Sequence, residues 1–183
     1  MRRHPVGFRY ASALFETARE NGTLEETLAD LATVSQVMEQ TNLLDEVFRH
    51  PKMTDQRKKG ILEQGFAGKV STPVFNLLRL LVDNKREDLF GVIADNFKAL
   101  TYEAQGIAEA DVYSAKALSE EEKEAIARVF AKRTGKTELL IQSHVDPEII
   151  GGLRVRIGDT VYDGTIANQL ARIHERMIEG NSR

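Results

Sequence analysis

The sequence predicts an α plus α/β fold, in which an N-terminal six-helix bundle is followed by a small β-α-β-β-α C-terminal domain. Apolar residues recur at helical spacing up to about Ala104, with turn and capping signals at short intervals. After Gln105 and Gly106, apolar residues instead alternate with polar ones, as they do in half-buried strands. The expected domains are therefore residues 1–104 and 105–183, and each has a length that can carry a core of its own.

Helix-stop signals divide the first domain into six segments. Asn21 and Gly22 end the first helix, because glycine readily adopts the left-handed conformation of a helix C-terminus. Thr23 and Glu26 are expected to form a capping box at the start of the second helix. Pro51 ends the third, since the residue before a proline is pushed out of the α region. The expected helices cover about residues 6–20, 23–38, 43–49, 54–66 and 71–83, and a sixth follows residues 84–85.

The second domain is expected to begin with a strand over residues 107–114 and a helix opened by the capping box of Ser119 and Glu122. That helix is expected to turn Ile126, Val129 and Phe130 inward. Further strands are expected over residues 138–145 and from residue 153, the latter turning at residues 158–159 into residues 160–162. A final helix from Thr165 carries a single apolar stripe: Ile166, Leu170, Ile173 and Met177.

Composition argues against several classes of protein. The formal net charge is −3 with acids and bases interspersed, which leaves no broad basic surface for a nucleic acid. No apolar run approaches the roughly 18 to 20 residues that span a bilayer. Without cysteine, the chain has no disulfides, thiol nucleophiles or iron–sulfur ligands. The four histidines show no metal-ligand spacing. We therefore expect no nucleic-acid partner, no metal, no cofactor and no catalytic residue.

Two short motifs suggest phosphate binding. Gly135-Lys136-Thr137 matches the end of a P-loop, but that motif requires a glycine where Phe130 stands, and it must lead from a strand into a helix. Here it is expected to lead from a helix into a strand. The basic cluster at residues 57–59 is either a solvated helix face or a small patch for phosphate or an acidic partner. A nucleotide-binding protein that uses Lys136 and Thr137 is thus kept as an alternative interpretation.

Two helices of the first domain have apolar or small residues on more than one face. A helix of this kind is either fully buried or meets a partner, and the pattern leaves both interpretations open. If the second faces adjoin, they form a groove suited to an amphipathic helix of another protein. The second faces consist of Tyr10, Ala13 and Thr17 on the first helix and of Asn76 and Leu80 on the fifth.

Residues 145–165 closely resemble the C-terminal signature of the F-type ATP synthase δ subunits, a family called the oligomycin-sensitivity-conferring protein in mitochondria. The glycines fit the sharp turns that the pattern requires, and Thr165 fits a helix cap. Similarity extends to residues 10–15, 81–86 and 89–97, with small departures at Thr165, where the family often has serine, and at His50, where asparagine is common. The signature positions are Asp146, Pro147, Gly151, Gly152, Gly158, Asp159, Asp163 and Gly164.

The resemblance implies a non-catalytic stator subunit that connects the catalytic head to the peripheral b stalk, so that proton flow drives ATP synthesis. It implies that the first domain binds N-terminal helical segments of α subunits through Tyr10, Ala13, Thr17, Asn76 and Leu80. The second domain would hold the C-terminal ends of the b subunit. The chain would be monomeric within the complex and attached to the membrane only through it. The absence of a long N-terminal extension favours a place on the cytoplasmic face of a bacterial inner membrane. A generic adaptor for other helical partners is the alternative.

Overall fold

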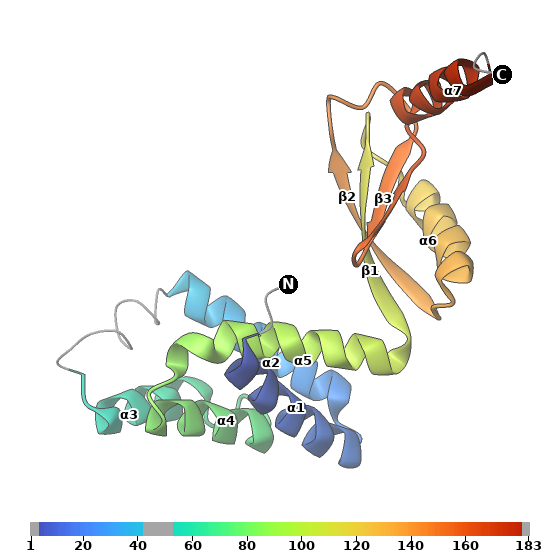
Figure 1. Ribbon diagram of the computed structural model, residues 1–183. Coiled ribbons are helices and arrows are strands. Elements are labelled where there is room, and N and C mark those ends of the chain that lie inside the picture. Colours follow the sequence, from blue (N-terminus) through green and yellow to red (C-terminus); the bar gives the residue numbers. More distant parts are fainter. Residues whose placement is uncertain (1–3, 42–52, 181–183) are drawn as a thin grey trace. The chain divides into compact units, whose positions relative to one another are not determined.

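The computed structural model describes residues 4–41 and 53–180 (Figure 1). The chain divides into two compact units, one ending at Thr101 and the other beginning at Tyr102. The division falls inside a helix, a few residues before the expected domain boundary between residues 104 and 105.

In the described part of the N-terminal unit, every regular element is a helix. The expected third helix, residues 43–49, lies outside the described residues, so a six-helix bundle stays a prediction. The described helices are α1 (Pro5–Glu20), α2 (Leu24–Gln40), α3 (Asp55–Phe66), α4 (Thr72–Asp83) and α5 (Phe90–Gln105), with a 3₁₀ turn, η2 (Glu87–Leu89), before α5. The α4 helix stops because Lys85 has a positive φ of 55°, and the Arg86 N–H donates back to the Leu81 carbonyl at 2.9 Å.

One apolar cluster joins the five described helices of this unit. Phe97 is fully buried, and its ring meets that of Phe15 edge-on with centroids 6.3 Å apart. The basic cluster contributes to the same packing, since the Lys58 ammonium lies 2.6 Å from the Glu87 carboxylate in a pair that is about nine-tenths buried. Lys59 pairs with Asp83. Two of the three basic side chains therefore hold α3 against the end of α4 and η2, which argues against a free phosphate patch.

Helix capping matches the expectations at one predicted box and differs at the other. The capping box of Ser119 and Glu122 is confirmed, with both reciprocal bonds present. The predicted box at Thr23 is wrong, because the Thr23 side chain makes no cap hydrogen bond. The Thr23 N–H closes the end of α1 by donating to the Ala18 carbonyl at 2.8 Å. This leaves Thr23 with φ −110° and ψ 27°, away from the extended conformation that capping requires.

The C-terminal unit is a four-stranded sheet with two helices. Its elements are β1 (Ile107–Ser114), α6 (Glu120–Thr134), β2 (Glu138–Val145), β3 (Leu153–Ile157), β4 (Thr160–Asp163) and α7 (Ile166–Gly180). The strand order is β2-β1-β3-β4, with β1 parallel to β2 and the other pairs antiparallel. The element order is β-α-β-β-β-α, one strand more than expected. The extra strand, β4, is the short second arm of the hairpin, and it pairs with β3 along its whole length.

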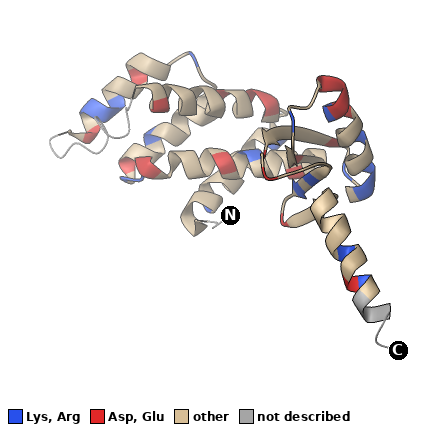
Figure 2. Ribbon diagram, turned by 90° about the horizontal axis from the view of Figure 1, so that it is seen from above, with Lys and Arg blue, Asp and Glu red and all other residues tan. Residues whose placement is uncertain are grey.

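Helix α6 covers one face of the sheet (Figure 1). The sheet contributes Ala110, Val112, Leu139 and Val155 to a small core. From α6, Ile126, Ala127, Phe130 and Ala131 pack against it. The prediction that Val129 points inward is wrong, because its side chain is 63% exposed. The inward face of α6 is formed by residues 126–127 and, one turn later, 130–131, and Val129 lies outside this face. Acidic residues begin α6 and basic residues end it, as the helix dipole favours (Figure 2).

Candidate functional site

The α1–α4 surface consists of the five residues predicted for a partner groove: Tyr10, Ala13, Thr17, Asn76 and Leu80. Helices α1 and α4 pack against each other. Their inward residues, such as Leu14 and Leu77, belong to the core. Ala13, Thr17 and Asn76 are exposed, and Leu80 is 46% exposed. Four of the five predicted residues are thus accessible on two neighbouring helices.

Tyr10 differs from the other four, because it is half-buried and packs against the core. Its hydroxyl accepts a hydrogen bond from Arg86 Nη1 at 3.3 Å. Arg86 lies in the turn that ends α4, where its N–H donates to the Leu81 carbonyl, so this bond links α1 to the end of α4. Tyr10 therefore supports the packing of its own unit and also borders the α1–α4 surface, and its role in binding a partner stays a prediction.

The Gly135-Lys136-Thr137 motif forms a helix end. Gly135 has the left-handed φ of 68° at the C-terminus of α6, and the Lys136 N–H donates to the Ala131 carbonyl at 3.0 Å. The Thr137 N–H donates to the Gly106 carbonyl at 2.9 Å. A P-loop needs such N–H groups free to cradle phosphates, whereas here they bond to carbonyls of the chain itself. The geometry therefore opposes the nucleotide-binding alternative.

The apolar stripe of α7 is exposed. Ile166 is 44% exposed, Leu170 61%, Ile173 53% and Met177 69%. In Figure 1, α7 lies at one end of the sheet, whereas α6 covers a face. The sequence revealed this stripe but not its exposure, since periodicity alone does not distinguish a stripe that meets the chain's own core from one that meets another molecule.

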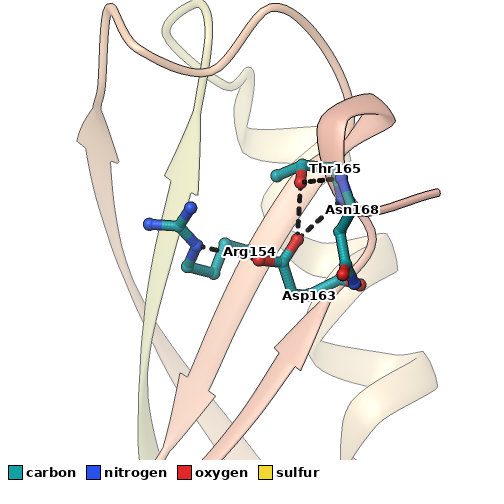
Figure 3. Close-up of polar contacts among 4 residues, drawn as sticks. All are labelled: Arg154, Asp163, Thr165 and Asn168. Carbon is teal, nitrogen blue, oxygen red and sulfur yellow. Dashed lines mark hydrogen bonds and ion pairs between the residues drawn. The ribbon is translucent and has the colours of Figure 1, made fainter. Parts of the chain in front are cut away.

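A polar network, here called the α7 anchor, fixes the start of this helix (Figure 3). It consists of Arg154, Asp163, Thr165 and Asn168. Asp163 Oδ1 accepts from the Thr165 hydroxyl at 2.7 Å and from the Thr165 N–H at 3.0 Å. Thr165 Oγ1 accepts from the Asn168 N–H at 3.3 Å, and Asn168 Nδ2 donates to the Asp163 carbonyl at 2.8 Å. Arg154 Nε donates to Asp163 Oδ2 at 3.3 Å. Thr165 itself is only 4% exposed.

Electrostatics favour the ionised form of the Asp163 carboxyl. The hydrogen bond from the Thr165 hydroxyl contributes most, and the Thr165 N–H and the Arg154 guanidinium add to it, so that the pKa of Asp163 lies below its ordinary value. The network therefore holds a carboxylate, which accepts hydrogen bonds from Arg154 on strand β3 and from Thr165, the residue directly before α7.

The glycine-rich part of the signature packs against the anchor. Gly152 has a φ of +84°, and a Cβ there would lie 2.4 Å from the Gly164 carbonyl oxygen. The Gly151 carbonyl accepts from the Ile166 N–H at 3.0 Å, and the Gly164 N–H donates to the Leu153 carbonyl at 2.9 Å. Only a residue without a side chain fits at position 152. The loop before β3 is thus bound directly to the segment that begins α7.

The remaining signature residues form turns. Asp146 Oδ1 accepts from the Glu148 N–H at 3.0 Å in the turn after β2, where Pro147 is exposed. Gly158, with a φ of +58°, and Asp159 form the two-residue turn between β3 and β4. These four residues shape the backbone of the loops, and their contacts give them no chemical role.

The open face of the sheet carries a second polar cluster. Asp111 Oδ2 accepts from Arg156 Nη2 at 2.7 Å and from Arg156 Nε at 3.2 Å. His144 Nε2 lies 3.2 Å from Asp111 Oδ1, and its ring stacks on that of Tyr113 with centroids 5.1 Å apart. The hydrogen bond from Arg156 is the main reason why the pKa of Asp111 is lowered. The cluster ties three strands together across a face that α6 does not cover.

The described residues, 4–41 and 53–180, were also searched for metal sites, membrane-spanning helices and cavities. No group of three or more histidine, aspartate or glutamate side chains in these ranges is placed to hold a metal ion. No helix in the same ranges has both the length and the apolar character needed to cross a bilayer. A cavity of about 10 Å³ in the N-terminal unit has room for a single water molecule. It is lined by Met38, Leu62, Leu78, Leu81, Val82, Glu87 and Phe90.

Comparison with known proteins gives consistent matches along the chain. The family profile described as "ATP synthase delta (OSCP) subunit" matches residues 6–177. A protein named ATP synthase subunit delta from Halalkalibacterium halodurans is 47% identical over 180 residues, which is 98% of each chain. One with the same name from Anoxybacillus flavithermus is 42% identical over 177 residues, 97% of this chain and 99% of that one. A chain in the cryo-EM structure of the Toxoplasma gondii mitochondrial ATP synthase hexamer shares the fold. Its TM-score is 0.71 at 24% identity, over 96% of this chain and 98% of that chain.

Proposed function

The chain belongs to the ATP synthase delta (OSCP) subunit family, and on that premise we propose that it connects the catalytic head of an F-type ATP synthase to the peripheral b stalk. It is a structural, non-catalytic subunit. As part of the stator, it keeps the head from turning with the central rotor, so that proton flow drives ATP synthesis. The observation that carries the proposal is a family match that runs through both compact units, from residue 6 to residue 177.

The N-terminal unit is proposed to bind N-terminal helical segments of α subunits through the α1–α4 surface. Exposed residues on two packed helices give an amphipathic segment a place to lie. Leu80 offers apolar area there, while Thr17 and Asn76 border it with polar groups. The Thr17 hydroxyl donates to the Ala13 carbonyl at 3.0 Å, so its hydrogen-bond donor is already satisfied within α1.

The C-terminal domain, predicted as residues 105–183, is proposed to hold the C-terminal ends of the b subunit. Its support is the exposed apolar stripe of α7, because exposed apolar area of this extent marks an interaction site more often than it marks a free surface. The two units would thus meet different partners. Within the complex the chain is proposed to be monomeric and to sit peripherally on the cytoplasmic face of the bacterial inner membrane, in keeping with its relatives from bacteria.

The proposal is tested by restoring function to membranes whose ATP synthase lacks this subunit. We expect the full chain to co-purify with head and stalk subunits and to restore ATP-driven proton pumping, because pumping requires a head that cannot rotate freely. Lys136→Ala should restore pumping fully and serves as the control for the nucleotide-binding alternative. A chain that binds neither head nor stalk would contradict the proposal, and nucleotide binding lost in Lys136→Ala would favour the alternative.

A further inference from the structure

The exposed stripe of α7 has the spacing of a coiled-coil seam. Its residues lie four, three and four positions apart, which is the alternation of the two core positions of a heptad. At 100° per residue they fall within an arc of about 60°. An arc this narrow matches the contact line between two helices, whereas a helix lying on a membrane has a wider apolar face. The seam is defined as Ile166, Leu170, Ile173 and Met177.

The residues that border the seam carry no negative charge. Ala167 and His174 lie along one side of it, and Gln169 and Arg176 lie along the other. The acidic residue among the described side chains of α7, Glu175, lies on the opposite face, and Figure 2 shows the charges grouped toward the later turns. In coiled coils these bordering positions select the partner by charge. A partner with acidic residues there would pair with Arg176.

The α7 anchor holds the seam in a fixed direction relative to the sheet. Thr165 is buried and bonded on both sides, to Asp163 and to Asn168, and the Ile166 N–H is bonded to the Gly151 carbonyl. Ile150, next to Gly151, is 82% exposed and adds apolar surface near the start of the helix. A partner therefore meets a helix whose first turn is already ordered, which lowers the entropic cost of docking.

We propose that α7 docks one amphipathic helix of a partner in coiled-coil fashion, and that acidic residues beside the partner's seam are selected by Arg176. Only the assignment of the partner's helix to the stalk rests on the proposed function. A second copy of this chain fits less well as the partner. The residues that border the seam include no acidic residue, so a second α7 would offer no carboxylate to pair with Arg176. A membrane surface also fits less well, because the seam is narrow and carries no aromatic residue.

The test uses the full chain and two designed helical peptides with the same leucine seam, one with glutamate and one with lysine at the bordering positions. We expect the glutamate peptide to bind roughly threefold to tenfold more tightly at low salt, and this preference to shrink as salt screens the charges. Arg176→Glu should reverse the preference. Leu170→Asp should weaken both peptides roughly tenfold or more, whereas Ala171→Asp, on a side away from the seam, should leave binding unchanged.

Three outcomes overturn the proposal. The first is equal binding of both peptides together with no reversal in Arg176→Glu. The second is self-association of the chain, seen by analytical ultracentrifugation and lost in Leu170→Asp. The third is binding to phosphatidylglycerol vesicles without binding to either peptide. Circular dichroism of each variant shows whether α7 is still folded. If Leu170→Asp still co-purifies with the stalk, this proposal fails and the connector function stands; if the unaltered chain does not co-purify, the connector function fails instead.

Discussion

The two compact units differ in how they use their apolar residues. In the N-terminal unit, five helices share one cluster in which Val34, Ile93 and Phe97 are fully buried. In the C-terminal unit, the sheet core consists of Ala110, Val112, Leu139 and Val155, while the apolar residues of α7 are exposed. The first unit therefore buries most of its large apolar side chains within itself, with Leu80 as an exposed exception. The second leaves a substantial part of that surface exposed, and its buried core is correspondingly small.

The largest expected effect is on the core of the N-terminal unit. Phe97→Ala should lower its free energy of unfolding by about 3–5 kcal/mol, because it removes a fully buried ring that packs on Phe15. Urea unfolding of the full chain, followed by hydrogen exchange in each unit, measures the change. Phe130→Ala, at a half-buried position on α6, is the matched control and should cost less. If both substitutions destabilise both units equally, the contrast between the units is wrong.

The second expected effect separates binding from folding on the α1–α4 surface. Leu80→Asp should weaken binding of an α-subunit N-terminal peptide by about 1.5–3 kcal/mol, since it replaces an exposed apolar contact with a carboxylate. Its melting temperature should change little. Tyr10→Asp should weaken attachment to the head as well, but it should also lower the melting temperature, because Tyr10 packs against the core. Calorimetric titration and thermal melts distinguish the two, and undiminished peptide binding in Leu80→Asp contradicts the groove.

The third effect concerns the backbone near the α7 anchor. Gly152→Ala should destabilise the C-terminal unit by about 1–3 kcal/mol, because the residue has a positive φ and its Cβ would meet the Gly164 carbonyl. Gly135→Ala is the control: its φ is also positive, at +68°, but no atom lies within 4 Å of an added Cβ. It should cost only about 1 kcal/mol. Equal losses in urea unfolding would mean that the close approach to Gly164 is unimportant.

A smaller effect is expected from the anchor hydroxyl. Thr165→Val keeps the shape of the side chain but loses both hydrogen bonds of Oγ1, and should cost about 1 kcal/mol of unfolding free energy. Thr165→Ser should restore most of that loss. Amide exchange in the first turn of α7 should accelerate in the valine variant alone. Unchanged protection there would show that the hydroxyl does not hold the helix start.

The smallest effect is the dependence of stability on pH. Since the pKa of Asp163 is lowered below 3.8 in the folded chain, its contribution to stability is fully present above pH 3.8 and is lost as the pH falls through the lowered value. Asp163→Asn should therefore flatten the acid side of the stability profile of the C-terminal unit. Asp111→Asn should act in the same direction, because that pKa is also lowered. Urea midpoints between pH 2 and 6 measure both.

Local sequence signals predicted most of the secondary structure but not its partners. The helix stop at Gly22 and the capping box of Ser119 and Glu122 are local signals, and the elements around them lie close to the expected places. The prediction at Thr23 failed because the Thr23 N–H donates to the Ala18 carbonyl at the end of the preceding helix. A capping pattern in the sequence does not reveal this hydrogen bond. Whether an apolar residue is covered depends on tertiary packing, which explains the error at Val129.

In the candidate sites, too, local backbone features could be predicted from the sequence, whereas features that depend on tertiary packing could not. Residues of the signature that need an unusual backbone, such as Gly152 and Gly158, are readable from sequence because few side chains tolerate a positive φ. The α7 seam was visible as a stripe, but its exposure follows from the position of the helix at the end of the sheet. Thr165 was expected only as a helix cap, and its hydrogen bond to Asp163 was not predicted. The link between Asp163 and Arg154 depends on the pairing of β3 with β4.

The exposed seam also makes the chain sensitive to oxidation before assembly. Met177 is 69% exposed, and oxidants convert an accessible thioether to a sulfoxide, which is polar and chiral. A sulfoxide at this position would place a polar group in the contact line between two helices. Once a partner helix covers the seam, the sulfur is shielded from oxidants. Copies of the chain that wait for a partner are therefore the ones exposed to this damage, and prompt assembly or enzymatic reduction of the sulfoxide would preserve them for the complex.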